Sequence, residues 1–169
     1  MTGIYVDSIK DKSNTKTLAT LSSSAVTLDS GVSFPAGHII QVLSNTAEPS
    51  VEWNGDNTAF ETSGGPSVAI AIASGNKVFL TYSVTANPNG AGMYLDFSDG
   101  TTNNLSGASN GILQISGTTN LPATITLLYD PSSTSSVTYT LGFRMSTGTT
   151  GYLGNSSQKP RITAMEVVV

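Results

Sequence analysis

Apolar and polar residues alternate along two long segments of the chain. Residues 78–84 and 137–145 place aliphatic or aromatic side chains at every second position, with mostly Thr and Ser between them. Successive strand residues face opposite sides, so this period of two predicts half-buried β-strands. Shorter segments of the same kind predict further strands at residues 39–44, 58–62, 68–74, 92–97, 111–116, 123–129, 151–155 and 161–169.

Short polar segments rich in Gly, Asn, Asp and Pro separate these strands, as turns require. Many short strands at this spacing favour a sandwich or barrel over a parallel α/β sheet. We therefore predict an all-β fold, a jelly-roll-like antiparallel β-sandwich over residues 39–169, with 99–110 as its longest loop. The turn segments are NGDN at 54–57, SGGP at 63–66, SGN at 74–76, NPNG at 87–90, SDG at 98–100 and DPSS at 130–133.

Two of the predicted strands are apolar on both faces. Residues 68–73 read VAIAIA, and residues 165–169 read MEVVV. A strand of this kind lies either between packed layers or against a neighbouring subunit. For the second case, the candidate oligomer interface consists of Val68, Ile70, Ile72, Val167 and Val169.

The first part of the chain carries no helix signal and is rich in Ser and Thr up to a Pro-Ala-Gly turn at 35–37. Such a segment cannot bury enough apolar surface to order itself alone. We expect an extended N-terminal arm, residues 1–38, that is ordered against another chain. The residues expected to dock are its apolar ones: Ile4, Val6, Ile9, Leu18, Leu21, Val26 and Leu28.

Charged residues make up 11% of the chain, whereas an average soluble domain has about 25%. Hydroxyl side chains take their place, since Ser and Thr number 47 of the 169 residues. The formal net charge is −4, and Lys10, Lys12 and Lys16, the nearest approach to a lysine cluster, are interleaved with Asp7 and Asp11. A nucleic-acid-binding surface needs a concentrated basic face, so we expect no nucleic-acid partner.

The chain has no cysteine, which excludes disulfides and Cys-ligated metal sites. Its first residues lack the basic and apolar regions of a signal peptide. No apolar segment approaches the roughly 20 residues of a membrane-spanning helix, so we expect no membrane partner.

Candidate catalytic residues are few. His38 is the only histidine and follows a turn, without a nucleophile elbow elsewhere. Glu52 with Asp56 or Glu61 is a formal glycosidase pair, yet these carboxylates surround a polar turn. Asp96 and Asp99 lack the spacing of a calcium loop. We therefore expect no enzyme activity, no metal and no cofactor.

Trp53 is the single tryptophan and lies beside Asn and Asp in VEWNGDN. An exposed aromatic ring in that setting can stack on a sugar, and Trp53 is the candidate glycan contact. Lone tryptophans are more often core or interface residues. Both interpretations remain open from the sequence.

Short motifs at both ends resemble those of virion proteins of tailed bacteriophages, especially marine ones. At the start these are Val6-Asp7-Ser8-Ile9, 11–15 with Asn14 where the pattern has glycine, Phe34-Pro35-Ala36-Gly37 and Ile39-Ile40-Gln41-Val42. At the end, 139–144 and 161–167 resemble the closing hairpin of small phage β-domains. Residues 45–136 match no pattern of this group.

The resemblance implies a structural role at the particle surface, as a capsid decoration or cement protein or as part of a head or tail fibre. It also implies a homotrimer, a docking partner such as the major capsid protein or another virion protein, and synthesis in the host cytoplasm. The alternative function is a carbohydrate-binding module of a tail fibre that recognises a host-surface glycan through Trp53 and the loop 99–110.

Overall fold

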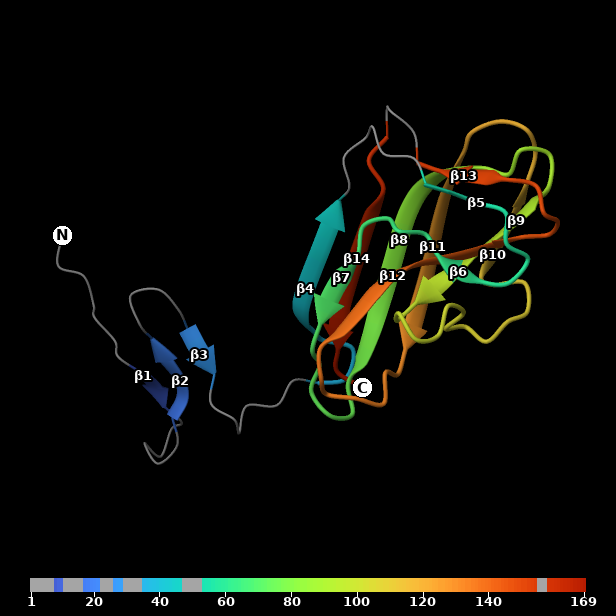
Figure 1. The fold of residues 1–169 in the computed structure, drawn as a ribbon. Helices are drawn as coiled ribbons and strands as arrows, with labels where there is room; N and C mark the ends of the chain where they lie inside the picture. The colour runs from blue at the N-terminus through green and yellow to red at the C-terminus, as the bar shows by residue number, and fades with distance from the viewer. Residues whose placement is uncertain (1–7, 11–16, 22–25, 29–34, 47–52, 155–157) are drawn as a thin grey trace, which may run out of the picture. The chain divides into compact units, whose positions relative to one another are not determined.

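The computed structural model of the chain describes residues 8–10, 17–21, 26–28, 35–46, 53–154 and 158–169 (Figure 1). The chain divides into two compact units, Met1–Pro35 and Ala36–Val169. The boundary after Pro35 falls just before the end of the predicted arm, 1–38.

The first unit contains a small antiparallel sheet. Its strands are β1 (Ser8–Lys10), β2 (Thr17–Leu21) and β3 (Val26–Leu28), in the order β1-β2-β3. The described residues of the predicted arm thus form three short paired strands, and the role of residues 1–38 as an attachment arm stays a prediction. Four of the predicted docking residues pair as follows. Ile9 and Leu28 both lie opposite Ala19, on its two sides, and Leu21 lies opposite Val26. Leu18 lies in β2, whereas Ile4 and Val6 lie outside the described residues.

The second unit is a sandwich of two antiparallel sheets, which confirms the predicted all-β class. In the first sheet β8 is central: β14 and then β4 lie on one side of it and β11 on the other, while β13 pairs with its end and β5 with β13. No two of β4, β14, β8 and β11 are consecutive in sequence, a pattern typical of jelly rolls. The strands are β4 (Ile39–Thr46), β5 (Trp53–Gly55), β8 (Lys77–Asn87), β11 (Leu121–Tyr129), β13 (Gly151–Leu153) and β14 (Arg161–Val167).

The second sheet has the order β10-β9-β12, and both β6 and β7 pair with β12 on its other side. Residues 54–55, predicted as a turn, are part of β5 because they pair with β13. Within the described residues, no helix is long and apolar enough to cross a membrane. The strands of this sheet are β6 (Glu61–Thr62), β7 (Val68–Ile70), β9 (Gly92–Ser98), β10 (Leu113–Ser116) and β12 (Val137–Met145).

The core lies between the two sheets and follows the alternation of the sequence. Every second residue of β8, β9 and β14 is buried there, and the rings of Tyr129 and Tyr139 meet edge to face at 6.3 Å. The fully buried large side chains are Val78, Leu80, Tyr82, Met93, Leu95, Phe97, Tyr139, Leu141, Phe143, Met145, Leu153 and Ile162.

Part of the predicted oligomer interface lies in this core. Val68, Ile70 and Ile72 are 6%, 3% and 7% exposed and pack within the same chain. Their side chains leave no surface for a second subunit, so this part of the prediction is wrong. The alternating alanines, rather than the branched side chains, face outwards, as at Ala69 and Ala71. Val167 is half-buried and Val169 is 57% exposed, so an interface at these two residues stays a prediction.

Candidate interaction surfaces

The outer face of the second sheet is covered by a loop of the same chain. Residues 99–112 fold back on β9 and β12, and the backbone N–H groups of Leu105 and Ile112 donate to the carbonyls of Phe97 and Leu95 at 3.0 and 2.8 Å. A Cβ added to Gly142 would lie 2.2 Å from the Asn103 carbonyl oxygen, so the loop touches the sheet directly. The loop therefore covers the outer face of this sheet over β9 and the middle of β12.

A buried carboxylate organises that loop. Asp96 is fully buried, and its Oδ1 accepts hydrogen bonds from the backbone N–H groups of Phe97 and Ser106 at 2.7 and 3.1 Å. The Ser106 hydroxyl donates to Oδ2. Because these donors satisfy the charge within one chain, Asp96 is a structural residue rather than a ligand awaiting an ion.

Arginine fixes the other end of the loop. The Arg144 guanidinium donates to the Ser109 carbonyl and to Asn110 Oδ1, and it lies 4.0 Å from the centre of the Tyr94 ring. The centre of the Phe60 ring lies 5.5 Å from the same guanidinium. Cation–π contacts of this kind hold a side chain in place at a partly exposed site. The loop 99–110, predicted as irregular and as a glycan contact, is thus tied to the sheet at both ends.

The outer face of the first sheet carries a different pattern. The register aligns one residue from each of four strands: Val42 opposite Met165, Met165 opposite Phe79, and Phe79 opposite Leu128. Val42 and Leu128, at the two ends of this apolar row, are 56% and 50% exposed. With neighbouring strands about 4.8 Å apart, the row spans roughly 15 Å.

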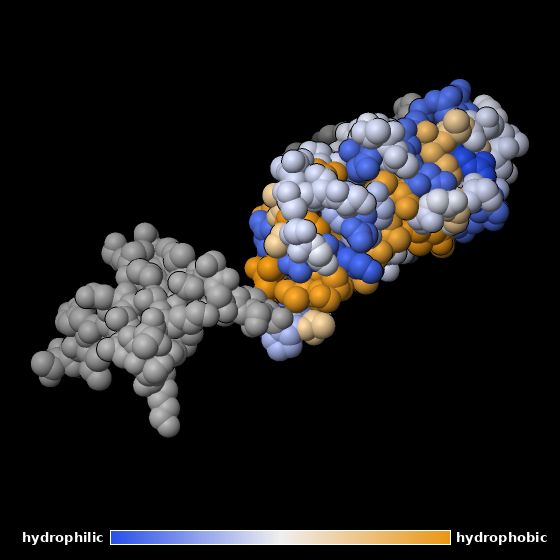
Figure 2. All heavy atoms as spheres, turned by 90° about the horizontal axis from the view of Figure 1, so that it is seen from below, coloured by the Kyte–Doolittle hydropathy of each residue, from blue (hydrophilic) through white to orange (hydrophobic). Residues whose placement is uncertain are grey.

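The apolar row lies near one end of the sandwich. Ile39, Ile40 and Val169 are 52%, 40% and 57% exposed, and Val167 is paired with Ile39 beside the row. Figure 2 views this end of the sandwich and shows apolar residues gathered there. Exposed apolar surface that is contiguous, rather than scattered, marks a contact site in soluble proteins.

Beyond the apolar row the same face becomes polar. The next row across the four strands is Ser44, Thr163, Thr81 and Thr126, and the row after it is Thr46, Arg161, Ser83 and Thr124. The Ser83 and Thr124 hydroxyls lie 3.0 Å apart and share a hydrogen bond. The face is thus divided into an apolar band and a hydroxyl band.

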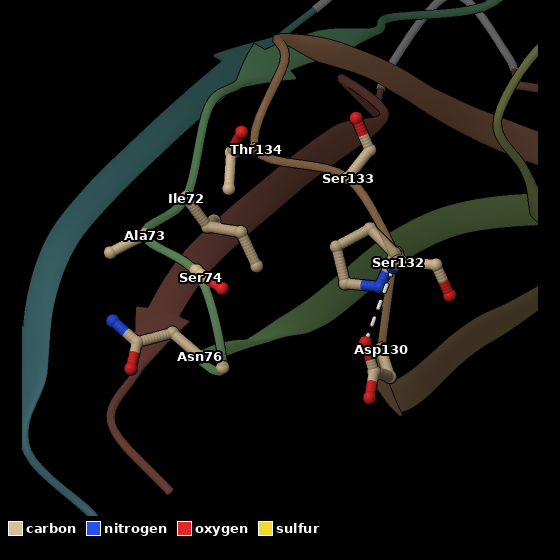
Figure 3. A pocket seen from close by; sticks show the side chains of 10 residues that line it. Ile72, Ala73, Ser74, Asn76, Asp130, Ser132, Ser133 and Thr134 are labelled. Carbon is tan, nitrogen blue, oxygen red and sulfur yellow. Dashed lines mark hydrogen bonds between the residues drawn. The ribbon is translucent and has the colours of Figure 1, made fainter.

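A polar groove of about 650 Å³ lies between two loops at the same end of the sandwich (Figure 3). One wall is residues 72–76 and the other is residues 130–134. Asp130 Oδ1 accepts a hydrogen bond from the Ser132 N–H at 3.2 Å, and Ser132 has a φ of 52°, which is unusual for serine. Glu166 fixes the wall 72–76: its Oε1 accepts hydrogen bonds from Ala73 N and Asn76 Nδ2, both at 2.7 Å.

The structure describes most of the residues weighed as catalytic candidates. Glu52 lies outside the described residues, Asp56 is exposed, and Glu61 accepts a hydrogen bond from Asn57 beside β5. His38 is exposed next to the turn before β4, where its carbonyl accepts a hydrogen bond from Val168 N at 2.9 Å. In the described part of the chain, no group of three or more His, Cys, Asp or Glu side chains is placed to hold a metal.

The candidate glycan contact stays a prediction. The backbone of Trp53 lies in β5, paired with Leu153 of β13, and its side chain is outside the described residues. The loop 99–110, its expected partner in that role, packs on the outer face of the second sheet.

The apolar row cannot be seen in the amino-acid sequence alone. Its four residues are far apart in the chain, and each is an ordinary apolar residue within a strand. The only local signal is that Phe79 and Leu128 interrupt an otherwise polar outer face. Only the register of β4, β14, β8 and β11 brings the four side chains into line.

No protein-family profile and no curated protein matches the sequence. Among solved structures, the chain is similar to the VP2 subviral particle of infectious bursal disease virus, with a TM-score of 0.36 and 11% identity over 85% of this chain and 43% of that one. It is also similar to the virus-derived T=1 particle and to the Gx strain, each at a TM-score of 0.31, with 13% and 12% identity over 88% and 86% of this chain. The chain spans about two fifths of the length of these proteins. At these scores and identities the similarities establish neither a family nor a function.

Proposed function

We propose that the chain is a structural protein of a tailed-bacteriophage particle, either a capsid decoration or cement protein or a component of a head or tail fibre. Its first unit attaches it to another virion protein, such as the major capsid protein, and its sandwich contacts further copies of itself in a homo-oligomer. The mechanism is adhesive: backbone pairing and apolar burial hold the chain in place.

The observation that carries the proposal is the apolar row of Val42, Met165, Phe79 and Leu128 on the outer face of the first sheet. Burying apolar surface contributes about 25 cal/mol per Å². The second sheet covers β9 and the middle of β12 with the loop 99–112, whereas Val42 and Leu128 at the ends of the row are half-exposed, so the row is the apolar surface suited to a partner.

The first unit supports an attachment role for a second reason. Its three strands have three, five and three residues, too few to enclose a core of their own. Apolar positions such as Leu21 and Val26 are nevertheless paired in register. A sheet this small gains stability by adding to another protein's strands or by packing against its surface. The terminal motifs described above, which resemble those of phage virion proteins, point the same way.

The test is the composition of the particle itself. Mass spectrometry of purified particles of the phage that encodes the chain should find it in many copies, and a single-particle reconstruction should contain the sandwich at the particle surface. A chain that is abundant in infected cells but missing from purified particles would contradict the proposal.

A matched variant then tests attachment. A chain without residues 1–35, supplied during infection beside a tagged full-length control, should fold but fail to enter particles. Circular dichroism checks the fold of the variant, and immunoblotting of purified particles checks its incorporation. Normal incorporation of the shortened chain would assign attachment to the sandwich instead.

A further inference from the structure

The free edge of the first sheet is the outer side of β4. Among the described strands it pairs only with β14, and it ends the sheet (Figure 1). An edge strand presents a row of unpaired backbone N–H and C=O groups that can pair with another strand. At about 3.3 Å per residue, the eight residues of β4 offer an edge of roughly 26 Å.

Proteins usually protect such an edge with charges, proline or a very short strand. The sequence of β4 is IIQVLSNT, which has neither charge nor proline. The opposite edge of the same sheet, β11, contains Pro122, and β5 and β10 have only three and four residues. Among the described strands, β4 is thus the long edge without charge or proline, and its one irregularity, at Ile40, leaves residues 41–46 as a regular edge.

We propose that β4 pairs antiparallel with β4 of a second copy of this chain, about a two-fold axis at Val42, so that two first sheets join into one. The β4 pairing names one contact between copies in the homo-oligomer proposed above. It rests on the proposed function only because that function requires an oligomer.

Charge favours an identical copy as the occupant. In a two-fold pair the residue on the axis faces its own copy, and charged residues close to the axis come near their own like charges, which opposes pairing. The chain as a whole has a net charge of −4, yet β4 is neutral along all eight residues. A second copy therefore meets β4 without repulsion.

Continuity of the outer face sets the register. Directly opposite residues in an antiparallel pair share a face of the sheet. A two-fold axis perpendicular to the joined sheet therefore lies midway between one residue and the same residue of the partner strand. With the axis at Val42, Ile40 faces Ser44 of the partner strand and Leu43 faces Gln41. The apolar row then continues from one copy into the next through two adjacent valines, each 56% exposed in the single chain. This register pairs residues 39–45 of the two strands, with the irregularity at Ile40 near each end of the paired segment.

The contact is expected to be weak in free solution. A single strand pair buries less than the roughly 800 Å² per partner of a standard interface, so the dimer should depend on protein concentration. Many copies bound to one particle would strengthen it through effective concentration.

Cross-linking tests the pairing directly, because the natural chain has no cysteine. Full-length variants with one cysteine at each of residues 40–44 are oxidised at several protein concentrations and separated on non-reducing gels. The Val42→Cys variant should cross-link fastest, and about tenfold faster than Leu128→Cys, since a disulfide needs Cβ atoms about 4 Å apart. Leu128 is the matched control: it ends the same row, is similarly exposed and lies on the opposite edge strand. Equal rates for the two variants would overturn the proposal.

Charge substitution provides the second measurement. Val42→Lys and Leu128→Lys both replace an exposed end of the row, so both should fold, as circular dichroism would verify. By sedimentation velocity of the full chain, Val42→Lys should raise the dimer dissociation constant about tenfold or more, while Leu128→Lys should leave it unchanged. If both variants dissociate, the partner packs on the sheet face rather than on the β4 edge, and the proposal fails. A wild-type chain that stays monomeric at high concentration overturns it too, whereas the chain's presence in purified particles would still support the virion role.

Discussion

At the scale of single residues, the tight approach of the loop 99–112 to the second sheet depends on a glycine. Gly142 lies in the middle of β12, and the Asn103 carbonyl occupies the space that a Cβ would need, at 2.2 Å. The Asn103 side chain adds a hydrogen bond to the Phe60 carbonyl at 3.3 Å. Covering of this face by the chain itself therefore requires a residue without a side chain at position 142.

Gly142→Ala should lower the free energy of unfolding by about 1–3 kcal/mol, because backbone atoms rather than a flexible side chain must move. Urea unfolding followed by tryptophan fluorescence measures the change. Gly148→Ala is the matched control: nothing lies within 4 Å of its added Cβ, and its stability should change by less than about 0.5 kcal/mol. Equal effects of the two substitutions would mean that the loop does not press on β12.

A second residue-scale effect concerns alkaline pH. Among the described residues, Tyr82 carries the one buried side-chain polar atom without a hydrogen-bond partner, its hydroxyl. Burial raises the pKa of Tyr82 above its usual value near 10, and the neighbouring Ser63 side chain offsets this only in part. Since the neutral hydroxyl is the form that fits the core, the stability it contributes is complete below pH 10 and is lost as the pH rises toward the raised pKa.

Tyr82→Phe should therefore leave the protein equally stable at pH 7, or more stable by about 1 kcal/mol, because an unsatisfied hydroxyl leaves the core. Above pH 10 the stability of the wild type should fall more steeply with pH than that of the variant. The two slopes should differ by up to about 1.4 kcal/mol per pH unit. Urea midpoints measured between pH 7 and 11 check both effects, with Tyr152→Phe in β13 as a control for a half-buried tyrosine. A parallel pH profile for Tyr82→Phe and the wild type would contradict this account.

At the scale of elements, Glu166 connects the end of β14 to the loop between β7 and β8. The side chain is 5% exposed and accepts two hydrogen bonds from that loop, at Ala73 N and Asn76 Nδ2. The apolar segment 165–169 thus contains one charged residue that points into the molecule, where it fixes one wall of the polar groove.

Glu166→Ala should lower stability by about 2–3 kcal/mol, since hydrogen bonds to charged groups contribute more than neutral ones. Hydrogen exchange of residues 71–77 should also become faster. Asn76→Ala removes only one of the two donors and should give a smaller loss, of about 1 kcal/mol. If the two variants exchange as slowly as the wild type, the loop is held by something other than Glu166.

At the scale of the whole molecule, the division after Pro35 leaves residues 36–38 with the sandwich. The Gly37 N–H donates to the Val168 carbonyl at 2.7 Å, and the Val168 N–H donates to the His38 carbonyl at 2.9 Å. These bonds extend the pairing of β4 with β14 beyond the strands themselves. The end of the chain is therefore part of the sandwich, and so is the turn that precedes β4.

Two fragments test this boundary. Residues 36–169 should fold with a cooperative transition, whereas residues 39–169 should be less stable by about 1–3 kcal/mol because both hydrogen bonds are missing. Thermal and urea unfolding of the two fragments, beside the full chain, measure the difference. Identical midpoints for the fragments would move the boundary to residue 38.

The fold class and the position of most strands follow from the amino-acid pattern alone, because the period of two is a local property that each strand carries. Residues 137–145 form β12 as predicted, and the buried members of 78–84 are the apolar ones. The absence of cysteine and the single histidine likewise excluded some kinds of chemistry without any structure.

Tertiary structure decided which apolar residues are core and which are surface. Val68, Ile70 and Ile72 looked suited to a partner but pack inside, while Val42 and Leu128, within ordinary strands, remain half-exposed and fall into line with Phe79 and Met165. It also decided that the first segment pairs with itself as three strands, and that β4 is an edge. Pairing, register and layer order depend on contacts between residues distant in sequence, and alternation along one strand carries no information about which strand lies beside it.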